Sequence, residues 1–154
     1  MTSEPDPTVE PAGGSERPAI ERLLIRCGLP TEGLSDCGGE LFVVRADGRV
    51  VGCAGLDVRG SAALLRSVAV DPDHRGRRLG ERLTAAALDR ATGLGLDAVY
   101  LLTTTAERFF PRFGFETIAR DVVPPAIRGS VEFTSACPAS AVVMRRPGPS
   151  APAA

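Results

Sequence analysis

The sequence predicts an α+β domain in which a mixed central β-sheet is flanked by helices. Strand-like apolar runs come first and are joined by short glycine turns, which indicates an antiparallel meander. One long amphipathic helix follows, and another strand-like run comes directly after it. A strand, a helix and a strand in succession form a right-handed crossover, so these two strands are expected to be parallel. At 154 residues the chain most simply forms one domain.

The two ends of the chain do not predict a packed structure. Residues 1–17 are rich in proline, glycine, serine, threonine and acidic side chains, and they lack an apolar period. Residues 147–154 have a similar composition. Such segments bury too little apolar surface to offset the entropy lost on ordering. We therefore expect disordered tails at 1–17 and 147–154 around a folded domain at 18–146.

The first elements of the domain are a helix and a hairpin. The helix is expected over residues 19–27 and ends at Gly28, because glycine readily adopts the left-handed conformation that closes a helix. Its apolar side chains recur at the i, i+3, i+4, i+7 spacing of one face: Ile20, Leu23, Leu24 and Cys27. Two strand-like runs within residues 41–56 then meet at Asp47-Gly48, a dipeptide that favours a tight hairpin turn.

The second half of the domain supplies the crossover. A third strand-like run, residues 63–70, is followed by a helix from residue 79 to about residue 91, which Gly93 is expected to close. One face of that helix is apolar: Leu79, Leu83, Ala86, Ala87 and Ala91. A strand is expected at 98–103, and a short helix and turn at 106–115. Two further strands with an irregular link are expected before the C-terminal tail.

The composition argues against several classes of protein. The formal net charge is −1, which gives no basis for binding nucleic acid or an anionic membrane surface. No apolar run approaches the roughly 20 residues that span a bilayer, and the acidic N-terminus lacks the features of a signal peptide. The four cysteines lack metal-binding spacing, which predicts reduced thiols and no metal site: Cys27, Cys37, Cys53 and Cys137. We expect a cytoplasmic protein.

Residues 68–83, VAVDPDHRGRRLGERL, join a strand-like run to the long helix through a basic loop. The first N–H groups of a helix lack intrahelical partners and lie at the positive end of its dipole, so this junction predicts an anion site. Two glycines let the backbone approach a ligand, and three arginines suit phosphate oxygens: Gly76, Gly80, Arg75, Arg77 and Arg78. The spacing fits neither a P-loop nor a dinucleotide-binding fingerprint. The alternative is a solvated turn that binds nothing.

The wider pattern identifies a family. V-x-V-x-P-x-x-R-G-x-x-x-G, then an amphipathic helix, a strand and A-x-x-F-F-x-x-x-G-F, resembles the GCN5-related N-acetyltransferase (GNAT) superfamily. This resemblance implies that the basic loop wraps the pyrophosphate of acetyl-CoA. Arg78 stands where the family has a glycine, which weakens the motif little if φ there is negative. The resemblance also implies that the backbone at 68–70 pairs with the pantetheine arm, and that an N–H near Val68 is an oxyanion donor.

The candidate cofactor residues that this resemblance implies are Val68, Ala69, Val70, Arg75, Gly76, Arg77, Arg78, Leu79, Gly80, Glu81, Thr103 and Phe110. Four segments, GCAGL, ALLRSVAV, YLLTTTAERFFPRFGF and EFTSACPASAVVM, are further similar to the arsenic-resistance N-acetyltransferases. That closer resemblance implies acetyl transfer to the amine of a small amino acid, or of an organoarsenical or phosphinate analogue. Dimers are common among such proteins, so a homodimer is one expectation for this chain.

Acetyl transfer to a neutral amine needs a stabilised oxyanion and a proton for the leaving thiolate. Many family members supply that proton from a tyrosine, but Phe110 occupies the position here and cannot donate. Tyr100 is expected to pack inside a strand. Water and the Cys137 thiol remain as donors, although a small buried side chain is an equal interpretation of Cys137. Thr103 is a candidate contact for cofactor or substrate, and Thr105 is expected to cap the next helix.

The candidate substrate residues are Arg66, Ser67 and Arg128. A charged residue within an apolar strand-like run fits a site for the carboxylate head of an amino acid, if Arg66 faces the cleft. Because side chains alternate along a strand, Val68 and Val70 are expected on the same side as Arg66. Glu132 is a candidate to accept the proton of the amine, directly or through water, or else is a surface residue.

The leading interpretation is an acetyl-CoA-dependent N-acetyltransferase in which a small amine attacks the thioester directly. The alternative is a catalytically degenerate acetyl-CoA-binding module with a regulatory role, which Phe110 and Arg78 favour. A structural domain that binds no cofactor is the third interpretation.

Overall fold

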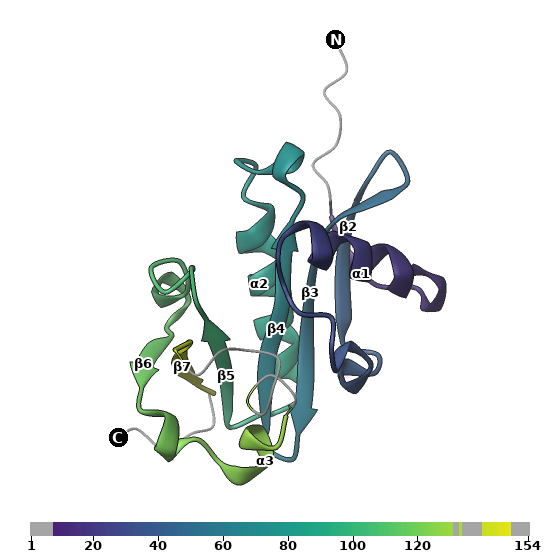
Figure 1. Cartoon of the computed structure of the whole chain (residues 1–154). Coiled ribbons are helices and arrows are strands. Elements are labelled where there is room, and N and C mark those ends of the chain that lie inside the picture. Colours follow the sequence, from purple (N-terminus) through teal and green to yellow (C-terminus); the bar gives the residue numbers. More distant parts are fainter. Residues whose placement is uncertain (1–7, 131–132, 134–139, 149–154) are drawn as a thin grey trace.

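The computed structural model describes residues 8–130, 133 and 140–148, which form a mixed seven-stranded sheet with helices on both faces (Figure 1). The strands are β1 (Val9–Pro11), β2 (Leu41–Ala46), β3 (Arg49–Arg59), β4 (Ala62–Val70), β5 (Ala98–Thr103), β6 (Glu116–Ile118) and β7 (Val142–Pro147). They lie in the order β1-β2-β3-β4-β5-β7-β6. Among the described strands, β4 and β5 pair in parallel and all other neighbours are antiparallel, which confirms the predicted meander and crossover.

The helices occupy both faces of this sheet. The α-helices are α1 (Arg17–Arg26), α2 (Leu79–Gly93) and α3 (Pro125–Arg128), and short 3-10 helices are η1 (Gly14–Glu16), η2 (Leu34–Cys37), η3 (Pro72–His74), η4 (Phe110–Phe113) and η5 (Arg120–Val122). Helix α2 covers one face, whereas α1 and α3 cover the other (Figure 1). The predicted apolar stripes are the buried ones, with Ile20 and Leu24 fully buried in α1 and Leu83 and Ala87 in α2.

The turns follow from the backbone freedom of a few residues. Asp47 and Gly48 have φ values of 52° and 74°, which are the two left-handed positions that a type I′ hairpin turn requires. Helix α2 continues through Gly93, and the left-handed glycine comes later, at Gly95 with φ 72°. The predicted closure at Gly93 is therefore two residues too early. In the described part of the chain, no helix has the length and apolar character needed to cross a membrane.

The predicted N-terminal tail does not hold for the residues that the structure describes. Strand β1 pairs with β2 through Val9 opposite Val44, and α1 begins directly after η1. Arg45 of β2 holds this segment by ion pairs to Glu10 and Glu16, and its Nε lies 2.8 Å from Glu16 Oε2. Composition indicated a tail because the segment has almost no apolar side chains of its own. At the other end, β7 includes Pro147, one residue beyond the predicted domain.

A bulge in β4 interrupts the regular pairing of the central strands. Cys53 of β3 lies opposite Ala69, but Gly55 lies opposite Arg66, so β4 contains one residue more than its partner across this interval. Ser67 sits in the bulge with a left-handed φ of 59°. The parallel ladder between β4 and β5 is confined to residues 62–64 of β4, so it ends before the bulge. The two central strands therefore diverge toward the end where α2 begins.

The ion pair between Arg45 and Glu16 predicts acid sensitivity. Hydrogen bonds from Arg45 and then from the Gly13 N–H lower the pKa of Glu16 from 4.5 to about 2. A carboxyl group with a lower pKa in the folded state stabilises the protein fully above pH 4.5 and loses that contribution as the pH falls toward 2. We expect Glu16→Gln to lower the free energy of unfolding at pH 7 and to flatten its decline between these pH values, as measured by urea unfolding.

The matched control is Glu107→Gln, which changes an exposed carboxylate in the link after β5. This variant should reproduce the wild-type pH dependence. If the free energy of unfolding of Glu16→Gln fell as steeply as that of the wild type on acidification, the link between this ion pair and acid stability would be disproved.

Candidate active site

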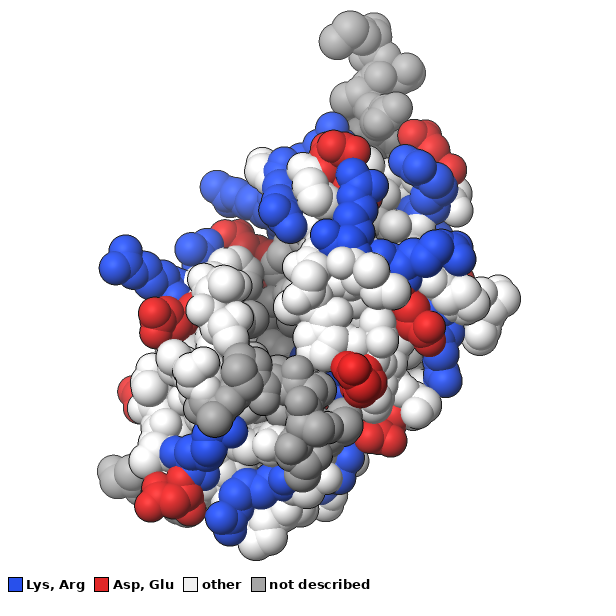
Figure 2. Space-filling model, viewed as in Figure 1, with Lys and Arg blue, Asp and Glu red and all other residues white. Residues whose placement is uncertain are grey.

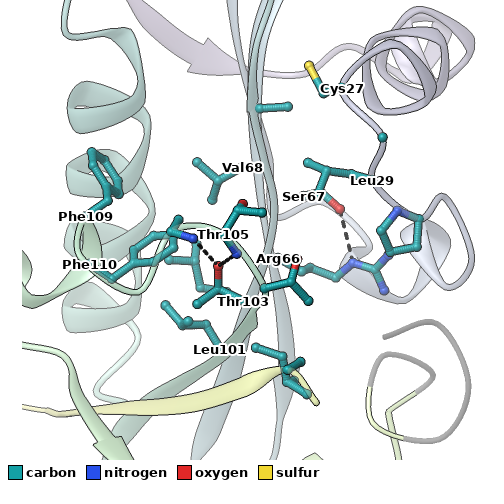
Figure 3. A pocket seen from close by; sticks show the side chains of 18 of the residues that line it. Cys27, Leu29, Arg66, Ser67, Val68, Leu101, Thr103, Thr105, Phe109 and Phe110 are labelled. Carbon is teal, nitrogen blue, oxygen red and sulfur yellow. Dashed lines mark hydrogen bonds between the residues drawn. The ribbon is translucent and has the colours of Figure 1, made fainter. Parts of the chain in front are cut away.

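The diverging strands β4 and β5 enclose a cavity of about 420 Å³ (Figure 3). One wall comes from residues 65–70 of β4, and the opposite wall comes from residues 101–106 at the end of β5 with Phe109 and Phe110. Residues 27–30, which follow α1, line the cavity beside β4. Nothing in the local sequence marked residues 27–30 or Phe109 as part of a site, because tertiary packing alone brings them there.

The bulge distributes the β4 side chains between the two faces of the sheet. Val68 and Val70 pack toward α2 with Leu79 and Leu83, whereas Ala69 packs under α1. Arg66 extends to the side of the α1 link, opposite Val68, as Figure 3 shows. The expectation that Val68 and Val70 share the side of Arg66 is therefore wrong, because the extra residue shifts the alternation by one position.

Arg66 lines the cavity and is 2% exposed. Its Nη2 donates to the main-chain oxygen of Glu32 at 2.6 Å, and its Nε donates to Ser67 Oγ at 3.2 Å. The Ser67 main-chain oxygen accepts a hydrogen bond from the Cys53 thiol at 3.1 Å. Two side chains from β3 and β4 thus hold the bulge in place, and Arg66 and Ser67, both predicted as substrate residues, are brought together at the cavity.

The loop from Val70 to α2 forms a second, open cavity of about 260 Å³. Its lining comprises Val70, Arg75, Gly76, Arg78, Leu79, Gly80, Glu81 and Phe109. Arg75 and Phe109 also line the first cavity, so the two are continuous. Basic side chains gather over this end of the molecule (Figure 2). Most of the predicted cofactor loop is therefore brought together, while Arg77 is exposed and belongs to neither lining.

The start of the basic loop is fixed by acidic residues. Asp71 accepts a hydrogen bond from the Asp73 N–H at 2.9 Å and pairs with Arg26 of α1 at 3.3 Å. The Asp73 N–H and, to a smaller extent, Arg26 lower the pKa of Asp71 below its ordinary value. Arg75 then bends back and donates from Nε to the Val70 oxygen at 3.2 Å. Its guanidinium group is thereby held at the junction of the two cavities.

Arg78 departs from what the sequence predicted for it. Its φ is 61°, in the left-handed region, and it is the N-cap of α2. A negative φ was the condition under which an arginine could replace the family's glycine without consequence, and that condition is not met. Gly76 has a φ of 87°, so the loop needs two left-handed residues within three positions and has glycine at only one.

Aromatic rings form the wall opposite β4. Phe110 is 7% exposed and packs edge-on against Phe109 and Phe115, so the position of the missing tyrosine is a buried part of the cavity wall. Arg112 lies 4.8 Å above the Phe109 ring and pairs with Glu81 at 2.6 Å, so the Glu81 side chain is already engaged by protein. A methyl group on Gly80 would lie 3.7 Å from Phe109, so glycine keeps that side of the second cavity open.

Thr103, at the end of β5, has the capping role that was expected of Thr105. Thr103 Oγ1 accepts hydrogen bonds from the N–H groups of Ala106 at 2.9 Å and Thr105 at 3.4 Å, so Thr103 provides the cap predicted for Thr105. All three residues line the cavity. Tyr100 is buried as predicted, and its hydroxyl accepts a hydrogen bond from Arg145.

The remaining candidates lie elsewhere. Arg128 ends α3, is exposed and does not contribute to the cavity lining. Glu132 and Cys137 lie outside the described residues. Cys27 and Cys53 are free thiols, and Cys37 is buried. In residues 8–130, 133 and 140–148, histidine, cysteine and acidic side chains form no cluster that could hold a metal ion.

The fold thus places a cleft beside two parallel strands, and Arg75 and Arg78 line its outer end. The family model described as an acetyltransferase (GNAT) domain matches residues 37–117, which is more than half of the chain. The chain therefore belongs to the GNAT acetyltransferase family, and the resemblance drawn from its loop and helix pattern is confirmed at this level.

Within this family, the curated relatives that match the chain include amino-acid acetyltransferases. An amino-acid acetyltransferase of Neisseria meningitidis is 32% identical over 91 residues, which cover 58% of this chain and 21% of the relative. The corresponding protein of Aeromonas salmonicida is 30% identical over 84 residues, or 53% of this chain and 19% of the relative. The chain thus spans about a fifth of the length of these relatives. Their names are those of amino-acid acetyltransferases rather than of the arsenic-resistance branch.

Two solved structures have the same fold along nearly the whole chain. N-acetylglutamate synthase from Neisseria gonorrhoeae, complexed with coenzyme A and L-arginine, has a TM-score of 0.77 and 25% identity and covers 94% of this chain and 34% of its own. A Mycobacterium tuberculosis protein in complex with CoA has a TM-score of 0.76 and 28% identity. The match covers 92% of this chain and 99% of that protein.

Replacing Arg78 by glycine should raise the free energy of unfolding by up to about 1 kcal/mol. The left-handed conformation costs an L side chain roughly 1–2 kcal/mol, and the greater freedom of glycine in the unfolded chain cancels part of that gain. Arg77→Gly is the control, because Arg77 is not among the positive-φ residues and this variant should lose stability. Chemical denaturation compares the two, and a less stable Arg78→Gly variant would show that the conformation carries no strain.

Proposed function

We propose that this protein is an acetyl-CoA-dependent N-acetyltransferase that acts on the amine of a small amino acid or amino-acid analogue. The observation that carries the proposal is the continuous cleft from the loop at the start of α2 to the bulge in β4. The names of the amino-acid acetyltransferases that it resembles support the substrate class. Organoarsenical and phosphinate analogues remain within this class through the resemblance of the C-terminal segment.

The residues present fit acetyl-CoA at both ends of the cleft. The second cavity combines the left-handed Gly76, the start of α2 and the Arg75 guanidinium group, which suit the charge and close approach of a pyrophosphate. The first cavity is walled by Val68 and Phe110, which suit the apolar pantetheine arm. Acetyl-CoA supplies the activated acetyl group, and the protein supplies its position.

The bulge offers a reason for the chemistry to occur at Val68. Ser67 and Val68 have no partner residue in the β3 register, so their backbone groups are set apart from the ordinary ladder. In this proposal the Val68 N–H donates to the thioester oxygen and stabilises the negative charge that develops there. The neutral amine forms the new C–N bond, the C–S bond breaks, and the amine proton passes to solvent.

The leaving thiolate takes its proton from water in this mechanism, since Phe110 has no proton to give. Thiols titrate near pH 8.5 in their ordinary state, so a thiolate leaves readily at the pH values where the amine is neutral. Cys137 stays a predicted donor, and Glu132 a predicted acceptor for the amine proton. The alternative function, an acetyl-CoA-binding regulatory module, is favoured by the same Phe110.

Arg75→Ala should weaken acetyl-CoA binding about 10- to 100-fold, because a charge-assisted hydrogen bond contributes roughly 1.5–3 kcal/mol. Isothermal titration calorimetry measures the affinity, and Arg128→Ala is the control, since Arg128 is exposed on α3 away from both cavity linings. Release of free thiol is then followed with a panel of amino acids, their phosphinate and organoarsenical analogues, and simple amines. Binding without turnover of any amine would favour the regulatory module, and no binding would exclude both functions.

Phe110→Tyr tests whether a missing acid limits the reaction. We expect kcat to change less than about threefold, because the thiolate departs without assistance, whereas a limiting general acid contributes roughly 100-fold or more. Phe109→Tyr is the matched control, since that ring also lines the cavity. A rise in kcat of tenfold or more in Phe110→Tyr alone would show that protonation is limiting.

A further inference from the structure

The guanidinium group of Arg66 connects two segments that lie on different elements. Its Nη2 binds the Glu32 oxygen at 2.6 Å, in the link between α1 and η2. Its Nε binds Ser67 Oγ at 3.2 Å, within the bulge of β4 (Figure 3). The contact to Glu32 spans 34 positions of the sequence, and Arg66 itself is 2% exposed. This side chain therefore acts as a buried tie between the link and the strand.

Both tied segments line the first cavity. Residues 27–30 of the link lie just before Glu32 and form the cavity wall beside α1. Ser67 precedes Val68, which lies on the α2 side of β4, toward Phe109 and Phe110. An amine that enters beside the link and a thioester held beside Val68 would approach each other across the Arg66 tie. A shift of either segment alters the distance between the two reacting atoms.

A charge network surrounds the tie. Asp57 of β3 is 2% exposed and accepts a hydrogen bond from Arg59 Nε at 3.0 Å, and Arg59 Nη2 lies 3.4 Å from Asp36 of η2. Asp57 shares a sheet face with Arg66, since Gly55 lies opposite Arg66 and Asp57 is two residues farther along. Burial raises the pKa of Asp57, whereas Arg59 and Arg66 lower it. Arg66 thus fastens the link at Glu32, and Arg59 fastens the adjoining η2 at Asp36.

We propose that Arg66 is a positioning residue for acetyl transfer, which fixes the link at residues 27–33 against the β4 bulge and so sets the separation of amine and thioester. This role rests on the proposed acetyltransferase function. It differs from a carboxylate clamp, because both contacts described above are made to groups of the protein itself. A misplacement of reacting groups by about 1 Å can reduce a rate about 100-fold.

The experiment compares Arg66→Met and Arg66→Lys with Arg45→Met. This matched control removes an arginine of β2 that also ties two segments by binding Glu10 and Glu16, and it lies outside the cavity lining. Each variant is assayed with the best amino-acid substrate and with its carboxamide, which keeps the amine but lacks the carboxylate. We expect kcat to fall about 10- to 100-fold in Arg66→Met for both substrates, by the same factor within about threefold. Arg66→Lys should recover part of the loss, and the affinity for acetyl-CoA should change less than about threefold.

If Arg66→Met instead raised KM for the amino acid and left the carboxamide unaffected, the proposal would be overturned. Arg66 would then bind the carboxylate of the substrate directly. Hydrogen exchange gives a readout that does not depend on activity: residues 28–34 and 66–69 should exchange faster in Arg66→Met and stay unchanged in Arg45→Met. Unchanged exchange in both segments would refute the tie. If the wild type turned over no amine, the proposed function would fail while exchange still tested the tie. If Arg66→Met did not fold, Arg66→Lys would carry both measurements.

Discussion

Strand β4 contains one residue more than β3 can pair with, and the candidate active site follows from that mismatch. The bulge at Ser67 reverses which face each later side chain occupies, so Val68 and Val70 turn toward α2 while Arg66 stays on the side of α1. The parallel pairing of β4 with β5 has already ended at Leu64, so the bulged residues lie in the unpaired part of β4 that lines the cavity. The left-handed backbone at Ser67 is held by hydrogen bonds to Arg66 and Cys53.

The cleft changes from basic to apolar along its length, and this order matches the groups of the proposed cofactor and substrate. The outer end combines the start of α2 with Arg75 and Gly76, where a phosphate group finds N–H donors and positive charge. The middle is apolar, between Val68 and Phe110. The inner end carries Arg66, which shares a sheet face with the buried Asp57 of β3. In the proposed function, the anionic part of acetyl-CoA and the uncharged amine would therefore bind at opposite ends of one groove.

Local signals were enough to predict the hairpin, the two long helices and the parallel crossover, because periodicity and turn residues determine these elements. Strand β1 escaped prediction because it is held mainly by pairing with β2 and by the ion pairs of Arg45, with Val9 as its one apolar core contact. The left-handed φ values of Ser67 and Arg78 occur at residues that carry no local preference for them. The cofactor loop could be located from its sequence, whereas the contact between Arg66 and Glu32 joins distant positions and is visible only in the folded chain.

The confinement of the parallel ladder to three residue pairs has a mechanical consequence. Among the described residues, this ladder is the sole strand pairing between β1–β4 and β5–β7, and it lies at one end of β4. The sheet therefore consists of two parts, β1–β4 and β5–β7, that share only a short ladder. Helix α2 connects the two parts in the chain and packs against both. In such a sheet the angle between the two parts changes most easily. We therefore expect the width of the groove to vary more easily than any other dimension of the sheet, and a ligand that contacts both parts to restrict that variation.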